Sequence, residues 1–434
     1  MKKAALHNLG CKVNAYETEA MQELLIEAGY EIVDFHEEAD VYVINTCSVT
    51  NIADRKSRQM IHQAKKRNPK AIVVAAGCYV QTSPDKAADD DAIDIVIGNN
   101  QKYRLPELLA VYEATGEKVT DLVEIGKDKS YEPMEMKRTA EHTRAFVKVQ
   151  DGCNQFCTYC IIPYARGRVR SRKPDEVVSE ITGLAQCGYQ EVVLTGIHLS
   201  SYGVDCGSSL IDLIELVAKI QGIRRIRLGS LEPGIVTEEF AKRLSQVEQI
   251  CPHFHLSLQS GCDATLKRMN RRYTAEEYKK RCEILRTYFE HPALTTDVIV
   301  GFPGETQEEF EITRKFLQDI DFYEVHLFKY SKRQGTPAAT MSGQLTEQQK
   351  ADRSHILSED LKENKKRFMS YYIGRDVEVL IEEKEQMGEK TFFTGHTKEY
   401  VKLAVPGIAC REQKNTFVTV KPTEFLNEDV MGVL

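Results

Sequence analysis

Three cysteines stand close together in the middle of the chain, and their spacing predicts a metal cluster. Cys153, Cys157 and Cys160 follow a C-x3-C-x2-C pattern. An odd set cannot pair completely into disulfides, whereas thiolates are the soft ligands that iron–sulfur clusters select. Three thiolates leave one iron of a 4Fe–4S cluster without a protein ligand, and such an open iron can bind a small molecule. A partial zinc site is the alternative, but no His or fourth Cys follows at zinc spacing.

The length and composition of the chain indicate several domains in a reducing compartment. With 434 residues, 12 cysteines, no tryptophan and a net charge of −7, about two to four domains are expected. Residues 1–8 lack the apolar core of a signal peptide, and the apolar run at 71–80 is too short to span a bilayer. We therefore expect a soluble cytoplasmic protein with reduced thiols and no membrane partner. The negative charge argues against a general nucleic-acid coat, but not against a locally basic site.

Residues 1–115 alternate short apolar runs with amphipathic stretches, which is typical of a parallel sheet with helices on both faces. Asn14 and Glu17 have the spacing of a helix N-cap and its capping partner, and a basic helix is expected at 51–67. The predicted strands are Lys3–Leu9, Val41–Thr46, Ala71–Ala76 and Ile93–Ile97. The sequence thus predicts an N-terminal α/β domain.

A second set of three cysteines follows the strands of this domain. Cys11, Cys47 and Cys78 each stand at the carboxyl end of a predicted parallel strand. These ends form the edge where open α/β sheets bind ligands. Three unrelated buried thiols are the alternative, since free Cys often serves as a small core residue. The shared position favours a second three-Cys cluster, again with an open iron.

The rest of the chain divides into a linker, a barrel and a tail. Residues 116–143 lack periodicity and are expected to be a linker. Residues 144–371 contain six predicted βα units, which make an open, three-quarter relative of the eight-fold barrel, and the Cys153 loop follows the first strand. The predicted barrel strands are Ala145–Val149, Glu191–Thr195, Arg225–Gly229, His253–Leu258, Thr295–Val300 and Glu324–Phe328. Residues 372–434 have the short alternating runs of a small all-β barrel.

Together these motifs carry a family resemblance that covers essentially the whole chain. The C-x3-C-x2-C loop, with Tyr159 before its last cysteine, resembles the signature of the radical S-adenosylmethionine (SAM) superfamily. A three-Cys α/β domain, a radical SAM barrel and a tail similar to the RNA-binding TRAM module, in this order, resemble the methylthiotransferases. The resemblance implies two 4Fe–4S clusters, SAM as cofactor, and insertion of a methylthio group at an unactivated C–H bond.

Local motifs suggest which substrate branch the chain resembles. Gly10-Cys-Lys-Val-Asn14, Asn45-Thr-Cys-Ser-Val-Thr50 and Tyr164-Ala-Arg-Gly-Arg168 are similar to the branch that acts on N6-threonylcarbamoyladenosine in tRNA. The isopentenyladenosine branch typically has Gly-Cys-Gln-Met-Asn at the first site, and the ribosomal-protein branch has Gly-Cys-Pro-Lys-Asn. The resemblance therefore implies 2-methylthio transfer to the threonylcarbamoylated adenosine 3′ of the anticodon.

The resemblance also implies which residues meet the cofactor at the strand ends of the barrel. For each of them, ordinary loop geometry is the alternative, and Glu232 could equally be a solvated loop acid. The expected SAM contacts are Tyr159, Thr195, Gly196, Glu232, Ser257, Gln259, Ser260, Val300 and Gly301.

Basic residues beside these motifs are candidates for RNA contacts, because Lys and Arg neutralise phosphates around an exposed loop base. The expected RNA-binding residues are Arg166, Arg168, Arg170, Arg172, Lys267 and Arg268. The expected partners are a tRNA anticodon stem-loop and an electron donor such as a flavodoxin or ferredoxin. From Tyr372 onward acids outnumber bases, so the tail is not expected to be a basic clamp.

Other functions remain open at this point. A ribosomal-protein or isopentenyladenosine methylthiotransferase would share both cysteine sets. A non-catalytic iron–sulfur carrier or an RNA-binding module would also explain part of the pattern. A carrier would not need SAM contacts or an open barrel mouth, and it would not cleave SAM when reduced.

Overall fold

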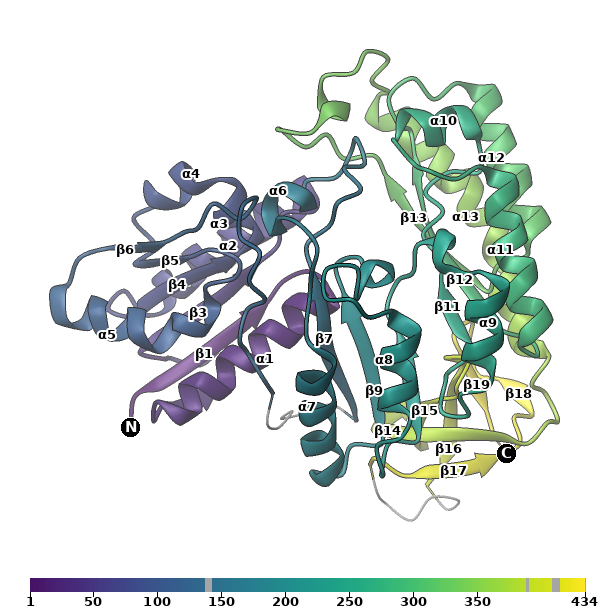
Figure 1. The fold of residues 1–434 in the computed structure, drawn as a ribbon, viewed down its shortest axis with the longest axis horizontal. Helices are drawn as coiled ribbons and strands as arrows, with labels where there is room; N and C mark the ends of the chain where they lie inside the picture. Colours follow the sequence, from purple (N-terminus) through teal and green to yellow (C-terminus); the bar gives the residue numbers. More distant parts are fainter. Residues whose placement is uncertain (137–142, 388–389, 408–413, 434) are drawn as a thin grey trace.

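The computed structural model describes residues 1–136, 143–387, 390–407 and 414–433. An α/β domain at the N-terminus lies beside an open barrel, and the C-terminal strands lie at one end of that barrel (Figure 1). Nowhere in these ranges does a helix combine the length and apolar character needed to cross a membrane.

The N-terminal domain is a six-stranded parallel sheet in the order β2-β1-β3-β4-β5-β6. Helices α1 and α5 cover one face and α2 with α4 covers the other, and every residue of the central strand β3 is buried. The strands are β1 Lys3–Asn8, β2 Glu31–Val33, β3 Val41–Thr46, β4 Ile72–Gly77, β5 Ile95–Ile97 and β6 Val119–Asp121. The helices are α1 Lys12–Glu27, α2 Asn51–Arg67, α3 Cys78–Thr82, α4 Pro84–Ala88, η1 Lys102–Arg104 and α5 Leu105–Thr115.

The segment predicted to be a linker contributes to the fold of both neighbouring domains. Strand β6 extends the first sheet by pairing with β5. Further along, the Tyr131 hydroxyl donates to the carbonyl of Lys148 at 2.6 Å, and Met134 and Met136 pack against Tyr16 of α1. This segment therefore fixes the first domain against the barrel.

The predicted capping pair of the first helix is wrong. Helix α1 begins at Lys12, with Cys11 at the N-cap position. The Asn14 amide instead donates to the carbonyls of Leu9 and Thr46 at 2.7 and 3.0 Å, and Glu17 is completely buried against the barrel. Tertiary contacts use both side chains, so neither caps the helix.

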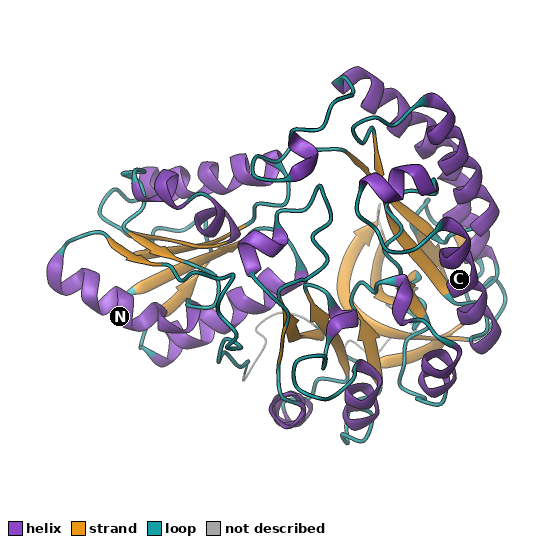
Figure 2. Ribbon diagram, turned by 45° about the horizontal axis from the view of Figure 1, so that its top comes forward, coloured by secondary structure: helices purple, strands orange, loops and turns teal. Residues whose placement is uncertain are grey.

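The predicted open barrel of six parallel strands is confirmed. Its strands form two sheets, ordered β10-β9-β7-β8 and β11-β12-β13. The two sheets are connected by isolated parallel bridges, Ile226 with Ile250 and Leu231 with Leu256. The helices cover the outside of the curved strand layer (Figure 2). The strands are β7 Arg144–Asp151, β8 Arg170–Ser171, β9 Glu191–Gly196, β10 Arg225–Leu228, β11 His253–His255, β12 Ala293–Val300 and β13 Glu324–Lys329. The helices are α6 Ile162–Arg166, α7 Pro174–Gln186, η2 Leu199–Ser201, α8 Leu210–Val217, η3 Pro233–Ile235, α9 Glu238–Ser245, α10 Asp263–Arg268, α11 Ala275–Tyr288, α12 Gln307–Ile320, η4 Pro337–Ala339 and α13 Glu347–Ser370.

The C-terminal strands make a six-stranded sheet in the order β17-β14-β15-β16-β19-β18, antiparallel except between β16 and β19. This agrees with the predicted all-β tail, and its strands are β14 Val377–Met387, β15 Lys390–His396, β16 Lys402–Pro406, β17 Phe417–Val420, β18 Glu424–Phe425 and β19 Val430–Gly432. The turn between β15 and β16 reaches the amino end of the barrel strands. There Tyr400 stacks on His253 with ring centroids 5.1 Å apart, and Arg227 donates to the carbonyl of Lys398 at 2.9 Å. The tail therefore closes the floor of the barrel.

Candidate iron–sulfur and cofactor site

The loop with Cys153, Cys157 and Cys160 leaves the carboxyl end of β7 and is held by backbone hydrogen bonds. The Cys153 N–H donates to the carbonyl of Gly167 at 3.0 Å, and the Thr158 N–H donates to the carbonyl of Met269 at 3.0 Å. These bonds tie the loop to α6 and to the loop after α10, so the three thiols have a fixed arrangement.

The surroundings of the three sulfur atoms in this loop favour metal ligands over free thiolates. Burial, together with the nearby Cys157 thiol and the Glu232 carboxylate, raises the pKa of Cys153 to about 11, although a backbone N–H at Gln155 acts in the opposite direction. Burial with the other two thiols raises the pKa of Cys160 to about 12. All three are free of disulfides. Crowded, buried thiols lose their protons readily only when a metal binds the sulfur atoms. Arg271 Nη1 lies 3.3 Å from Cys157 Sγ, where it can balance the charge of a thiolate.

The second set of cysteines gathers at one edge of the N-terminal sheet, as predicted. Cys11 follows β1, Cys47 follows β3 and Cys78 follows β4, and these three strands are neighbours. Cys47 and Cys78 are buried, whereas Cys11 is exposed. Burial and then the nearby Cys78 thiol raise the pKa of Cys47 to about 11.

Two glycines create the space for these thiols. Gly10 has a φ of +110°, and a Cβ built there would lie 2.9 Å from Cys47 Sγ. Gly77 has a φ of +98°, and its Cβ would lie 2.6 Å from Asn45 Oδ1. Any side chain at either position would displace the backbone beside a candidate ligand. The three sulfur donors and their tight glycine surroundings fit an iron–sulfur cluster with three protein ligands.

A buried group of charged side chains connects the two cysteine sites. Glu17 of α1 pairs with Lys148 and Arg166 of the barrel, both at 2.7 Å, and with Lys102 at 3.0 Å. Asp151, two residues before Cys153, pairs with Lys148 at 2.7 Å and Arg166 at 3.1 Å. We call these five residues the interdomain ion cluster.

Arg166 in this cluster extends to the second cysteine site. Its Nη2 donates to Asn14 Oδ1 at 2.6 Å, and the Cys11 thiol lies 3.7 Å from the same oxygen. On the neighbouring side, Asn99 Nδ2 donates to the carbonyl of Ala165 at 2.8 Å and lies 3.6 Å from Cys78 Sγ. Helix α6, which directly follows the Cys153 loop, therefore also contacts Asn14 and Asn99, the residues beside Cys11 and Cys78.

Three of the five arginines predicted to bind RNA are buried, so that prediction is wrong for them. Arg166, Arg170 and Arg172 expose 0%, 1% and 2% of their surface. Arg170 donates to the carbonyl of Arg166 at 2.9 Å, and Arg172 forms an ion pair with Glu180. Their charges balance internal acids and cannot reach a phosphate.

The other basic residues of the prediction lie at the surface. Arg168 is exposed, with its guanidinium carbon 4.5 Å from the centre of the Phe156 ring, and Tyr164, which contacts the same ring edge-on, is 46% exposed. Lys267 is exposed as well. Arg268 is partly exposed and is engaged by Glu309, with Nη1 2.9 Å from Oε1. Arg168 and Lys267 remain the best-placed candidates for RNA contacts.

Several predicted SAM contacts surround the Cys153 loop. The Glu232 carboxylate receives a hydrogen bond from Arg271 at 2.8 Å and lies 3.7 Å from His198 Nε2. Gly196 packs so closely on Gln150 that a Cβ would lie 2.8 Å from its side-chain oxygen. The Ser257 carbonyl accepts a hydrogen bond from Tyr273 at 2.7 Å.

Other predicted SAM contacts have an evident structural role. The side chain of Val300 is in the hydrophobic core under the helices, and the Gly301 N–H donates to Glu305 at 3.1 Å. The Ser260 hydroxyl lies 3.1 Å from that of Thr313. Thr195 and Gln259 are largely buried, and Tyr159 packs with Phe302 in a small apolar cluster. Val300, Gly301 and Ser260 can therefore meet a cofactor only through backbone groups.

Arg271 and His198 are residues of this site that sequence reasoning missed. Arg271 links Cys157 to Glu232, and the His198 N–H donates to Gln150 Oε1 at 2.7 Å. The position of His198, two residues after the strand end at Gly196, was a usable signal. Arg271 stands in a basic run whose role depends on the fold.

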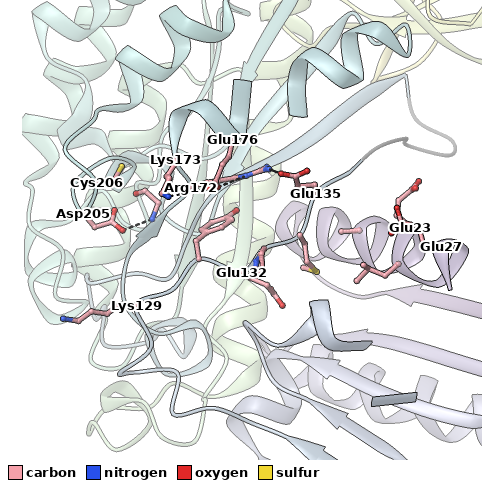
Figure 3. Close-up of a pocket in the computed structure, with 16 residues that line it drawn as sticks. Glu23, Glu27, Lys129, Glu132, Glu135, Arg172, Lys173, Glu176, Asp205 and Cys206 are labelled. Carbon is pink, nitrogen blue, oxygen red and sulfur yellow. Dashed lines mark hydrogen bonds and ion pairs between the residues drawn. The ribbon is translucent and has the colours of Figure 1, made fainter. Parts of the chain in front are cut away.

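One cavity near the domain junction is separate from both cysteine sites. It has a volume of about 690 Å³ and contains none of the six candidate ligands. Glu23, Glu27, Glu132 and Glu135 line it together with Arg172, which pairs with Glu135 at 3.3 Å (Figure 3). An acid-rich cavity of this kind does not suit a phosphate.

Comparisons with known proteins agree with this geometry. Residues 3–98 match the Uncharacterized protein family UPF0004, and residues 147–317 match the Radical SAM superfamily. A Threonylcarbamoyladenosine tRNA methylthiotransferase MtaB of Bacillus subtilis is 42% identical over 94% of this chain and 91% of its own length. A tRNA-2-methylthio-N(6)-dimethylallyladenosine synthase of Clostridium novyi is 34% identical over 98% of this chain and 94% of its own length. The radical SAM methyltransferase TsrM of Kitasatospora setae has a similar fold, with a TM-score of 0.57 and 16% identity over 78% of this chain and 77% of that one.

The three-Cys loop at the carboxyl end of the first strand of an open six-stranded barrel defines a radical SAM enzyme. Such an enzyme binds SAM and a 4Fe–4S cluster. More narrowly, the chain belongs to the methylthiotransferase family of radical SAM enzymes.

Proposed function

We propose that this enzyme converts N6-threonylcarbamoyladenosine, next to the anticodon of tRNA, to its 2-methylthio derivative. The observation that carries the proposal is that one short helix, α6, joins two separate three-Cys sites across the domain junction. A relative that shares 42% identity carries that substrate in its name, and one named for dimethylallyladenosine shares 34%.

Two cysteine sites divide the work of this reaction. Cys153, Cys157 and Cys160 would hold the 4Fe–4S cluster whose electron cleaves SAM. Cys11, Cys47 and Cys78 would hold an auxiliary cluster that provides the sulfur, and a second SAM molecule would provide the methyl group. Replacing the C2–H bond of adenine by a C2–SCH3 bond requires both hydrogen removal and sulfur delivery. Two sites with three protein ligands each support this division.

The residues around the Cys153 loop position SAM. Glu232 is held by Arg271 and faces the cysteine loop. There its carboxylate can accept a charge-assisted hydrogen bond from the amino group of SAM. Gly196 and Thr195 at the end of β9, and Ser257 and Gln259 after β11, supply backbone groups at the same edge of the barrel. Tyr159 closes the apolar side.

An exposed face beside the loop suits the RNA. Tyr164 and Arg168 are exposed and each contacts the Phe156 ring. Lys267 is exposed as well. Aromatic rings stack on unpaired bases, and exposed cations neutralise phosphates. An adenine can reach a buried reaction centre only by leaving the stack, which a loop nucleotide does at low cost. The electron donor we propose is a flavodoxin or ferredoxin.

The test uses anaerobically reconstituted enzyme, SAM, reductant and an anticodon stem-loop deuterated at C2 of the threonylcarbamoyladenosine. We expect 5′-deoxyadenosine that carries one deuterium and a product nucleoside with an added methylthio group, both by mass spectrometry. The Cys47→Ala variant should still cleave SAM but form no product, and Cys206→Ala, an exposed thiol outside both sites, should behave as wild type. Product from Cys47→Ala, or equal turnover of unmodified and isopentenylated stem-loops, would contradict the proposal.

A further inference from the structure

Three polar side chains that the reaction described so far does not use meet on neighbouring strands of the barrel. His255 lies on β11, Asp297 on β12 and His326 on β13, three strands that run side by side (Figure 1). One ring nitrogen of each histidine and one carboxylate oxygen of Asp297 all lie within 4.8 Å of one another. The two rings are stacked with centroids 5.8 Å apart, and His255 Nε2 lies 3.3 Å from Asp297 Oδ2. We call these residues the polar triad.

The polar triad faces the interior of the barrel. Successive side chains of a strand point to opposite faces. The neighbours Phe254, Val298 and Leu327 lie in or against the hydrophobic core under the helices. The triad side chains must therefore point the other way, and in that interior the imidazole of His326 is exposed to solvent.

The triad has free hydrogen-bonding capacity. Thr295 Oγ1 lies 3.0 Å from His255 Nδ1 and fixes the ring. Within the described part of the chain, His255 Nε2 is buried without a well-formed hydrogen bond, although Asp297 is close. The same part of the chain offers no hydrogen bond to the His326 ring, and the Asp297 side chain is 31% exposed. A ligand in the barrel would find both donors and acceptors here.

The triad lies between the expected cofactor and the floor of the barrel. Ser257 follows His255 by two residues toward the carboxyl end of the strands, which corresponds to about 7 Å of extended chain. Below the triad, Tyr400 and His253 close the floor. Burial, followed by the positive charges of Arg227 and Lys12, lowers the pKa of His253 well below its ordinary value, so the lower interior favours an anion.

We propose that the polar triad binds the threonyl part of an N6-threonylcarbamoyl group and so selects this substrate, an inference that rests on the proposed function. His326 donates a hydrogen bond to the carboxylate of the ligand. The Asp297 carboxylate accepts a hydrogen bond from the hydroxyl or the urea N–H of the ligand. His255, held by Thr295, acts as a positioning residue that orients Asp297.

This assignment explains how one barrel can distinguish substrates that differ only at N6. An isopentenyl group has neither donor nor acceptor, so binding it would remove the triad from water without compensation. Sites built to hydrogen-bond a substrate group reject the analogue that lacks it more strongly than apolar pockets reject an extra group. The triad thus favours a charged, hydroxyl-bearing amino-acid substituent.

The test compares binding of three anticodon stem-loops, carrying threonylcarbamoyladenosine, isopentenyladenosine or plain adenosine, to the reconstituted enzyme. We expect wild type to bind the first most tightly. His326→Ala and the isosteric Asp297→Asn should each weaken that binding about 10- to 100-fold, as expected for one hydrogen bond to a charged group, and leave the other two unchanged. His62→Ala and Asp90→Asn, an exposed pair 3.0 Å apart on the first domain, serve as the matched control. Iron content should stay at the wild-type level in all four variants, and the two control variants should also keep the wild-type rate of SAM cleavage.

The outcomes separate this inference from the proposed function. If wild type binds the threonylcarbamoylated stem-loop selectively through His326 and Asp297 but forms no methylthio product, the proposed function fails and the inference stands. If wild type binds all three stem-loops equally, or if His326→Ala weakens all three alike, the inference is overturned. A stoichiometric divalent metal other than iron in wild type, lost in Asp297→Asn, would overturn it in favour of a metal site.

Discussion

Replacing Arg166 by Gln should destabilise the folded enzyme rather than lower its affinity for RNA. The side chain is fully buried and pairs with Glu17 at 2.7 Å and Asp151 at 3.1 Å. Removing one partner from a buried ion pair costs about 3–5 kcal/mol, because the other charge is left without compensation. Lys148 still contacts both acids, so we expect the lower end, about 3 kcal/mol.

Urea unfolding of the anaerobic protein measures this loss. With an m value of about 3 kcal/mol/M, the midpoint should fall by about 1 M. Arg168→Gln is the matched control, because Arg168 lies only two residues beyond Arg166, just after α6, but is exposed. That variant should keep the wild-type midpoint and should instead weaken tRNA binding with a smaller salt dependence.

The opposite pattern would refute this reasoning. If Arg166→Gln unfolded at the wild-type urea concentration while its tRNA affinity lost salt dependence, Arg166 would have to be accessible to phosphate. The interdomain ion cluster would then not hold the two domains together.

Three further outcomes follow from the same structure. Cys153→Ala should abolish reductive SAM cleavage and lower the iron content by about one 4Fe–4S cluster per chain; cleavage at the wild-type rate would remove Cys153 from the ligand set. The double variant Arg168→Gln, Lys267→Gln should raise the Kd for tRNA and reduce its salt slope by up to about 2, and unchanged filter binding would exclude this face as the RNA site. Burial alone would raise the pKa of the Asp151 carboxyl, but Lys148, Arg166 and Arg170 hold this pKa well below its ordinary 3.8. The ionised carboxylate therefore stabilises the fold fully above about pH 4, and this stabilisation is lost as the pH falls toward the folded pKa. A urea midpoint that stayed level into stronger acid would contradict the ion pairing.

Most of the fold was predictable because its strands are buried and their apolar runs are continuous. The run at Val41–Thr46 is entirely buried as β3, and each predicted barrel strand overlaps an observed one. Strands β2 and β6 were missed because each has three residues and lies at an edge of the sheet. Short edge strands carry little hydrophobic signal.

The candidate site was predictable where the chemistry is local and unpredictable where it depends on packing. The spacing of Cys153 to Cys160 carries its meaning within eight residues. The roles of Asn14, Glu17 and Arg166 depend on contacts across the domain junction, with Arg166 and Glu17 149 positions apart. A charge run gives no sign of whether its members face solvent or buried acids, which is why Arg166, Arg170 and Arg172 were misassigned.

The closure of the barrel floor by the tail sets a length scale for RNA binding. The Cys153 loop lies at the carboxyl end of the strands, and the turn at Tyr400 lies at their amino end. Strand β12 runs between these ends with eight residues, which corresponds to a length of about 26 Å. Because Arg225 and Arg227 bond the tail turn directly to β10, this spacing is rigid. An RNA that touches both the tail and the mouth must run along the outside of the barrel, and the enzyme would act as a ruler that fixes which nucleotide enters.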